Sequence, residues 1–127
     1  MAVHQLLTNT FSKPANADLS TYQYRAMYQV NDGDVDLLTN SGTVPLGILL
    51  NKPSVAKQAA SIAGLGCIVK MEAGATIDEG QLVMADANGR GTPASGGSAT
   101  WHIGLALSPA ASAEYFTLQV NPGVGNY

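Results

Sequence analysis

Residues 44–53 (VPLGILLNKP) are the most informative stretch of the sequence, and a similar stretch follows at residues 102–109 (HIGLALSP). Each contains a short apolar run with one glycine inside it, and each ends at a proline. Such a run favours a buried strand over a helix, and the strand must stop at the proline because proline cannot donate to a neighbouring strand. We therefore predict two strands that end near Pro53 and Pro109, each with a bulge or a close backbone approach at its glycine.

The sequence around these strands also repeats, which indicates an internal duplication. Gly33 and Gly80 begin similar segments 47 positions apart, whereas Gly47 and Gly104, inside the two strands, lie 57 positions apart. We assign the ten extra positions to a flexible polar insert at residues 91–100. The similar segments are 33–42 with 80–89, and 67–74 with 115–123. Chance reuse of turn and strand patterns is the alternative. Two copies are too few for a solenoid, so we predict a small β-sandwich or barrel-like domain.

The rest of the chain has turn signals about every 8 to 12 residues, which is typical of all-β domains. Residues 22–30 alternate between two faces and predict a strand. Residues 54–63 fit either a short helix or a loop followed by a strand, and we favour the strand. Asn88 and Gly89 predict a hairpin with a type I′ turn. Further strands are predicted at residues 35–39, 67–72, 82–85, 101–107 and 115–120.

The two ends of the chain lack a regular pattern. Residues 1–20 carry apolar side chains without a period, so we predict an extended N-terminal arm that is ordered only where another surface receives it. Residues 121–127 predict a loose C-terminal tail. We therefore divide the chain into an arm, residues 1–20, and a β domain, residues 21–127.

The composition argues against several classes of function. Only 12% of the residues are charged, the net charge is −3, and the six Lys and Arg residues are scattered, so no basic stripe predicts nucleic-acid binding. No apolar run approaches the roughly 20 residues of a membrane span, and the first residues do not resemble a signal peptide. The single cysteine, Cys67, lies in an apolar run, where we expect a small buried side chain.

No pattern predicts catalysis, a metal ion or a cofactor. Three aspartates alternate over residues 32–36 as at the start of a calcium loop, but Leu37 and Thr43 stand where that loop needs glycine and glutamate. The histidines, His4 and His102, have no second ligand at zinc spacing. Because no acid, base and nucleophile converge, we predict that the protein is not an enzyme.

Residues 45–53 (PLGILLNKP) resemble a stretch common in small head-decoration, or capsid cement, proteins of tailed bacteriophages. The resemblance continues, in the family's order, through residues 75–83, 86–90, 92–94 and 103–106. It covers roughly residues 30–121 and contains no catalytic signature. It implies a compact β domain, often a trimer, that sits on the outer shell and clamps neighbouring capsid subunits.

On this resemblance we expect a structural virion protein on the capsid exterior, made in the host cytoplasm. Its expected partners are the major capsid protein and further copies of itself in a homotrimer, with no nucleic acid and no membrane. The candidate contact residues are apolar residues of the arm and the two strand-ending prolines: Val3, Leu6, Leu7, Phe11, Pro53 and Pro109.

Two other classes of protein stay open. One is another virion component, a head–tail joining or tail-tube protein, which would form rings rather than free trimers. The other is a small β module that carries a group or binds a sugar. Lys70 resembles the lysine of biotin-carrying domains, but the turn that precedes that lysine follows it here. A sugar-binding module would use Trp101 and exposed tyrosines.

Overall fold

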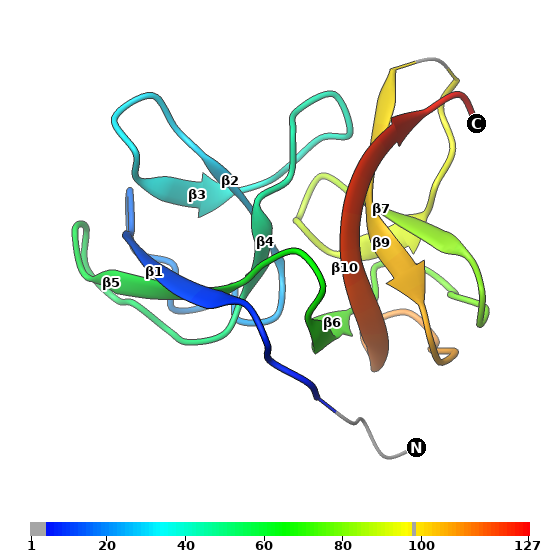
Figure 1. Ribbon diagram of the computed structural model, residues 1–127, viewed down its shortest axis with the longest axis horizontal. Coiled ribbons are helices and arrows are strands. Elements are labelled where there is room, and N and C mark those ends of the chain that lie inside the picture. Colours follow the sequence, from blue (N-terminus) through cyan, green and yellow to red (C-terminus); the bar gives the residue numbers. More distant parts are fainter. Residues whose placement is uncertain (1–4, 98) are drawn as a thin grey trace.

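Figure 1 shows two antiparallel β-sheets side by side, one from each half of the chain. The computed structural model describes residues 5–97 and 99–127, and these residues form ten strands and no helix. The first sheet contains β1 (Thr10–Pro14), β2 (Ala26–Gln29), β3 (Val35–Leu37), β4 (Gly47–Leu49) and β5 (Ala59–Ala63). The second contains β6 (Ile68–Glu72), β7 (Leu82–Ala85), β8 (Gly91–Pro93), β9 (Thr100–Ala106) and β10 (Tyr115–Gly125). The predicted all-β, sandwich-like class is confirmed. Within the described ranges, no helix could cross a membrane.

The two sheets have the same strand order. The first runs β1-β5-β4-β2-β3 and the second β6-β10-β9-β7-β8, so each strand of the first half has a counterpart five strands later. In each sheet an isolated bridge also joins the two edge strands. Ala15, directly after β1, pairs with Val35 of β3, and Ala73, directly after β6, pairs with Gly91 of β8. Both halves are therefore partly closed, like small barrels, and the repeated topology fits an internal duplication.

The halves match at offsets of 56 to 58 positions, so the predicted offset of 47 is wrong. Gly33 and Gly89, 56 positions apart, follow the equivalent strands β2 and β7 and have positive φ angles of 90° and 72°. Ala15 and Ala73, 58 positions apart, form the equivalent bridges. The insert at residues 91–100 is also wrong, because it contains β8, the counterpart of β3. Short turn–strand patterns recur within each half, and only the strand pairing distinguishes them.

Gly47 and Gly104 lie at equivalent places in β4 and β9, and both allow the close backbone approach that the sequence predicts. A Cβ atom on Gly104 would lie 2.9 Å from the carbonyl carbon of Gln119 and closer still to its oxygen. A Cβ atom on Gly47 would lie 2.8 Å from Cγ2 of Ile62 and would overlap the carbonyl oxygen of Ala63. Only a residue without a side chain fits at either place.

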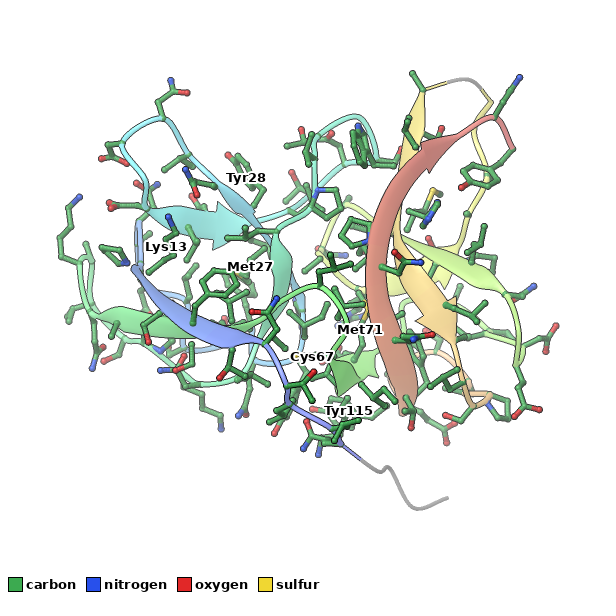
Figure 2. All side chains as sticks on the ribbon, viewed as in Figure 1. Lys13, Met27, Tyr28, Cys67, Met71 and Tyr115 are labelled. Atoms are coloured by element: carbon green, nitrogen blue, oxygen red, sulfur yellow. The ribbon has the colours of Figure 1, made fainter. Side chains whose placement is uncertain are left out.

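Two buried clusters form the core. The first-half cluster includes Met27 and Leu49 and contains no residue of the second half. The shared cluster includes Met71 and Phe116 of the second half and also takes in side chains from the first. Those first-half members are Ala26, Leu38, Ile48 and Ala63. Figure 2 shows Met27 among the strands of the first half and Met71 beside β10. Cys67 is a free and fully buried cysteine, as predicted.

The strand predicted over residues 22–30 is shorter than expected. Only Ala26–Gln29 pair as β2, and Tyr24 has a positive φ of 65°, which ends any extended run before it. Ala26 and Met27 are both fully buried, in the shared and the first-half cluster respectively. The strand therefore contributes side chains to both clusters. For residues 54–63 the favoured strand is confirmed by β5.

The tail and one turn also differ from expectation. β10 continues to Gly125 and pairs with β9 from Leu118 to Gly125, with an irregularity between Val120 and Gly123, so most of the predicted loose tail is ordered. The hairpin at Asn88 and Gly89 joins β7 and β8, but Gly89 alone of the two has a positive φ, which excludes a type I′ turn. The backbone oxygen of Asp86 accepts from the amide of Gly89 at 3.2 Å, as in a type I turn followed by a left-handed glycine.

The second part of the predicted arm belongs to the first sheet. β1 pairs with β5 over five residues, and Ala15 and Leu19 are almost completely buried. The amide of Leu19 donates to the carbonyl of Pro53 at 2.9 Å. Residues 10–19 therefore contribute to the core of the first half, and what can be called an arm among the described residues is the segment 5–9.

Candidate interaction surface

The segment at residues 5–9 crosses from the first sheet to the second. Leu6 and Ile68 exchange two backbone hydrogen bonds of 2.8 Å, which adds Leu6 to the edge of β6. Asn9 holds the segment to the linker between the halves: its side-chain amide donates to Leu65 O at 3.1 Å, and its backbone contacts the Cys67 sulfur at 3.4 Å. The segment therefore has a defined path over the linker.

Three leucines on these two segments are exposed. The exposed fractions are 55% for Leu6, 43% for Leu7 and 60% for Leu65. Scattered single leucines are normal on protein surfaces, whereas a contiguous apolar patch is typical of an interaction site. These three leucines lie on adjoining segments, because Asn9 is bonded to Leu65. We call Leu6, Leu7 and Leu65 the leucine surface.

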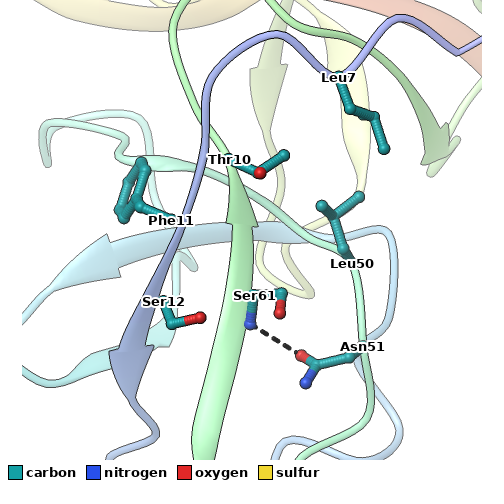
Figure 3. A pocket seen from close by; sticks show the side chains of 7 residues that line it. All are labelled: Leu7, Thr10, Phe11, Ser12, Leu50, Asn51 and Ser61. Carbon is teal, nitrogen blue, oxygen red and sulfur yellow. Dashed lines mark hydrogen bonds between the residues drawn. The ribbon is translucent and has the colours of Figure 1, made fainter.

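A groove of about 440 Å³ lies next to the leucine surface, on the first sheet (Figure 3). Leu7 and Leu50 stand at one end, and Thr10, Ser12 and Ser61 line its floor. Its other lining residues are Phe11 and Asn51. The Asn51 side chain is fixed, because its oxygen accepts from Ser61 N at 2.9 Å and its amide donates to Ala59 O at 3.0 Å. The groove is thus uncharged, with apolar and hydroxyl-bearing sides.

Equivalent places in the two sheets carry side chains of different size, and one of these places, that of Ser12, lines the groove. The places of Ser12 and Ala59 in the first half are held by Lys70 and Tyr115 in the second. The Lys70 ammonium lies 4.8 Å from the centre of the Tyr115 ring and 4.6 Å from that of Tyr24. These large side chains cover the second sheet where small ones leave the first uncovered.

A cluster of charged side chains joins the two halves. The Glu72 carboxylate lies 3.4 Å from Arg25 Nη2 and 2.7 Å from Arg90 Nε, and the side chains of Arg25 and Glu72 are mostly buried. Two hydrogen bonds accompany it: the backbone amide of Ala26 donates to Gly89 O at 2.9 Å, and the side-chain Nη1 of Arg25 donates to Asn88 O at 3.2 Å. The cluster fixes the orientation of one sheet against the other.

Two of the alternating aspartates form ion pairs with Lys57. Lys57 makes a short ion pair with the buried carboxylate of Asp34 and lies 3.5 Å from Asp32. The hydrogen bond to Asp34 raises the pKa of Lys57. The amide of Asp34, and then the charge of Lys57, lower the pKa of Asp32. Among the described residues no group of three or more His, Cys, Asp or Glu side chains is placed to hold a metal ion.

The structure places the six predicted contact residues in different surroundings. Leu6 and Leu7 are exposed, whereas Phe11 is half-buried against the first-half cluster. Pro53 is buried, but Pro109 is exposed beside a hollow of about 310 Å³. Val3 lies outside the described residues.

Sequence reasoning missed Leu65 and Leu50. Leu65 stands between two glycines in the linker, and an apolar residue in such a turn was an available signal. The sequence could not predict that Leu50 lines the groove, because its position there depends on the pairing of β4 with β5.

The comparisons with known proteins agree with this architecture. The model of the phage cement protein family matches residues 15–121. A solved structure, the head fiber gp8.5 N base of bacteriophage phi29, is similar to the chain with a TM-score of 0.65 and 18% identity, over 93% of this chain and 95% of the other. A comparison with curated proteins found no match. The family match spans most of the chain, and the chain therefore belongs to the phage cement protein family, as a capsid-associated structural protein of the virion.

Proposed function

We propose that the protein binds the outer surface of the capsid as a homotrimer and stabilises the shell by contacting neighbouring capsid subunits. The observation that carries this proposal is the leucine surface beside an open groove. Burying a fully exposed leucine contributes roughly 1.5–3 kcal/mol, so each of these partly exposed leucines can contribute about 1 kcal/mol at a contact. Three chains in one trimer would combine such contacts through their high effective concentration.

The proposal assigns the protein no catalytic role. The charged clusters of the described residues are used in ion pairs within the fold, as at Glu72 and Asp34. Shell stabilisation requires only that the assembled capsid binds the protein better than the separated subunits do.

The test adds purified protein to undecorated, expanded shells of the cognate phage and measures occupancy and the shell melting temperature. A Leu6→Ser/Leu7→Ser double variant is expected to bind roughly tenfold more weakly or worse, because two apolar contacts are lost. Val44→Ser is the matched control, since Val44 is 56% exposed but lies in the loop before β4. Equal occupancy of all three forms would exclude the leucine surface as the anchor.

The oligomeric state is tested separately, by sedimentation of the free protein. A trimer supports the proposal, whereas closed rings of higher order would favour a head–tail joining or tail-tube role. Failure of the unaltered protein to bind cognate shells would refute capsid decoration itself. Mass added at Lys70, or binding to glycans, would instead indicate a carrier or a sugar-binding module.

A further inference from the structure

Asn88 has the chemical surroundings of a self-modifying residue. It is followed by glycine, its side chain is exposed, and the side-chain amide makes no hydrogen bond to the described residues. Asparagine is thermolabile because the following backbone nitrogen can attack its side-chain carbonyl carbon. Glycine at the next position favours this attack, because it has no Cβ to obstruct the approach.

The peptide group between Asn88 and Gly89 also accepts a hydrogen bond that the sequence does not predict. Arg25 Nη1 donates to Asn88 O at 3.2 Å, and that oxygen belongs to the same peptide group as the Gly89 nitrogen. When the nitrogen loses its proton, the negative charge is shared with this oxygen, directly beside the guanidinium. Hydrogen bonds to a charged partner are stronger than neutral ones, so Arg25 stabilises the reactive form.

We propose that Asn88 converts spontaneously to aspartate and isoaspartate through a succinimide, and that Arg25 promotes the conversion. When the turn opens and the Gly89 amide leaves its 3.2 Å hydrogen bond to Asp86 O, solvent hydroxide takes the Gly89 proton. A bond then forms between the Gly89 nitrogen and Asn88 Cγ, and the side-chain amide takes a proton from water and leaves as ammonia. Water then opens the ring at either carbonyl. In the isoaspartate product, the former Asn88 backbone carbonyl is a free carboxylate next to Arg25, where it can form an ion pair.

The modification changes the contact between the two halves. The isoaspartate linkage adds one methylene to the backbone directly before Gly89, whose oxygen accepts from Ala26 N at 2.9 Å. The new carboxylate also competes with Glu72 for Arg25, which lies 3.4 Å from Glu72. We therefore expect the modified protein to melt at a lower temperature than the fresh protein.

The experiment incubates the folded full chain at mildly alkaline pH. Peptide mapping and isoaspartyl methyltransferase labelling follow residue 88. Arg25→Gln should slow the conversion roughly tenfold, the effect of losing one hydrogen bond to a charged group. Arg90→Gln is the matched control, because it removes the other arginine beside Glu72 but no bond to Asn88. Asn88→Gln identifies the site.

Each outcome bears on the proposal. Conversion at residue 88 that Arg25→Gln slows more than Arg90→Gln supports it. An intact Asn88 after prolonged incubation, or equal rates in the unaltered protein and Arg25→Gln, would overturn it. If Arg25→Gln does not fold, Arg25→Lys keeps a charge opposite Glu72 but shortens the reach to Asn88. That variant should also be slower, and an unchanged rate would again contradict the proposal.

Discussion

Replacing Gly104 by alanine tests how the duplicated sheets are built. The added methyl group would overlap the backbone oxygen of Gln119, with the carbonyl carbon of that residue only 2.9 Å away. Both atoms belong to β10, which is held between β9 and β6 along the second sheet. The overlap therefore cannot be relieved by rotating a side chain, and the strands must separate.

The structure allows the size of this effect to be worked out. Overpacking typically costs about 1–3 kcal/mol, and contact with paired backbone places this substitution near the upper end, at about 3 kcal/mol. The unfolding entropy is about 2.1 cal/mol/K per residue, which for 127 residues gives about 0.27 kcal/mol/K. A loss of about 3 kcal/mol therefore lowers the melting temperature by roughly 11 °C.

The assay is thermal unfolding followed by circular dichroism, with two further alanine variants. Gly47→Ala is the equivalent substitution in the first sheet and should show a similar decrease, because its added methyl would overlap the oxygen of Ala63. Gly42→Ala is the control, since its nearest neighbour would be Asn40 Oδ1 at 3.5 Å, an ordinary contact. That variant should stay within about 0.5 kcal/mol of the unaltered protein.

One result would refute the reasoning directly: Gly104→Ala melting at the same temperature as Gly42→Ala. The shape of the transition carries a second test. The shared cluster contains side chains from both halves, so a single cooperative transition is expected for every variant. Two separate transitions would show that the halves unfold independently.

Three further predictions concern the core, the ion pair and metal content. Phe116→Ala removes a fully buried ring from the shared cluster and should cost about 3–5 kcal/mol in denaturant unfolding, whereas exposed Tyr115→Ala should cost much less. The Lys57 pKa is raised by folding, so its contribution is full below the ordinary lysine pKa and lost as pH rises through the folded value. The Asp32 pKa is lowered, so its contribution is full above the ordinary aspartate pKa and lost as pH falls through the folded value. Stability measured against pH should therefore decline less at alkaline pH in Lys57→Met, whereas the acid decline should change little, because the Asp34 amide still lowers the Asp32 pKa. An unchanged alkaline decline would contradict this. Metal analysis of the purified protein should find no stoichiometric calcium or zinc, and one tightly bound ion per chain would contradict this prediction.

Local sequence patterns are enough to predict the fold class, most strand positions and the special glycines. Apolar runs bounded by glycine and proline mark short buried strands wherever they occur, and β4, β5, β6, β7 and β9 lie within or close to the predicted segments. The backbone restrictions at Gly47 and Gly104 are equally local, because a missing side chain in a strand already indicates a close approach. The burial of Cys67 follows from the apolar residues around it.

The register of the duplication, the pairing of both ends and the candidate interaction surface depend on contacts between distant segments. Similar turns occur twice within each half, so the correct partner of Gly33 emerged only from the strand pairing. Residues 10–14 and 121–125 have no pattern of their own, yet each segment pairs with a neighbouring strand. The leucine surface combines residues 58 positions apart, Leu7 and Leu65. Backbone hydrogen bonds and packing bring these distant segments together. Such contacts cannot be predicted from the pattern of neighbouring residues in the sequence.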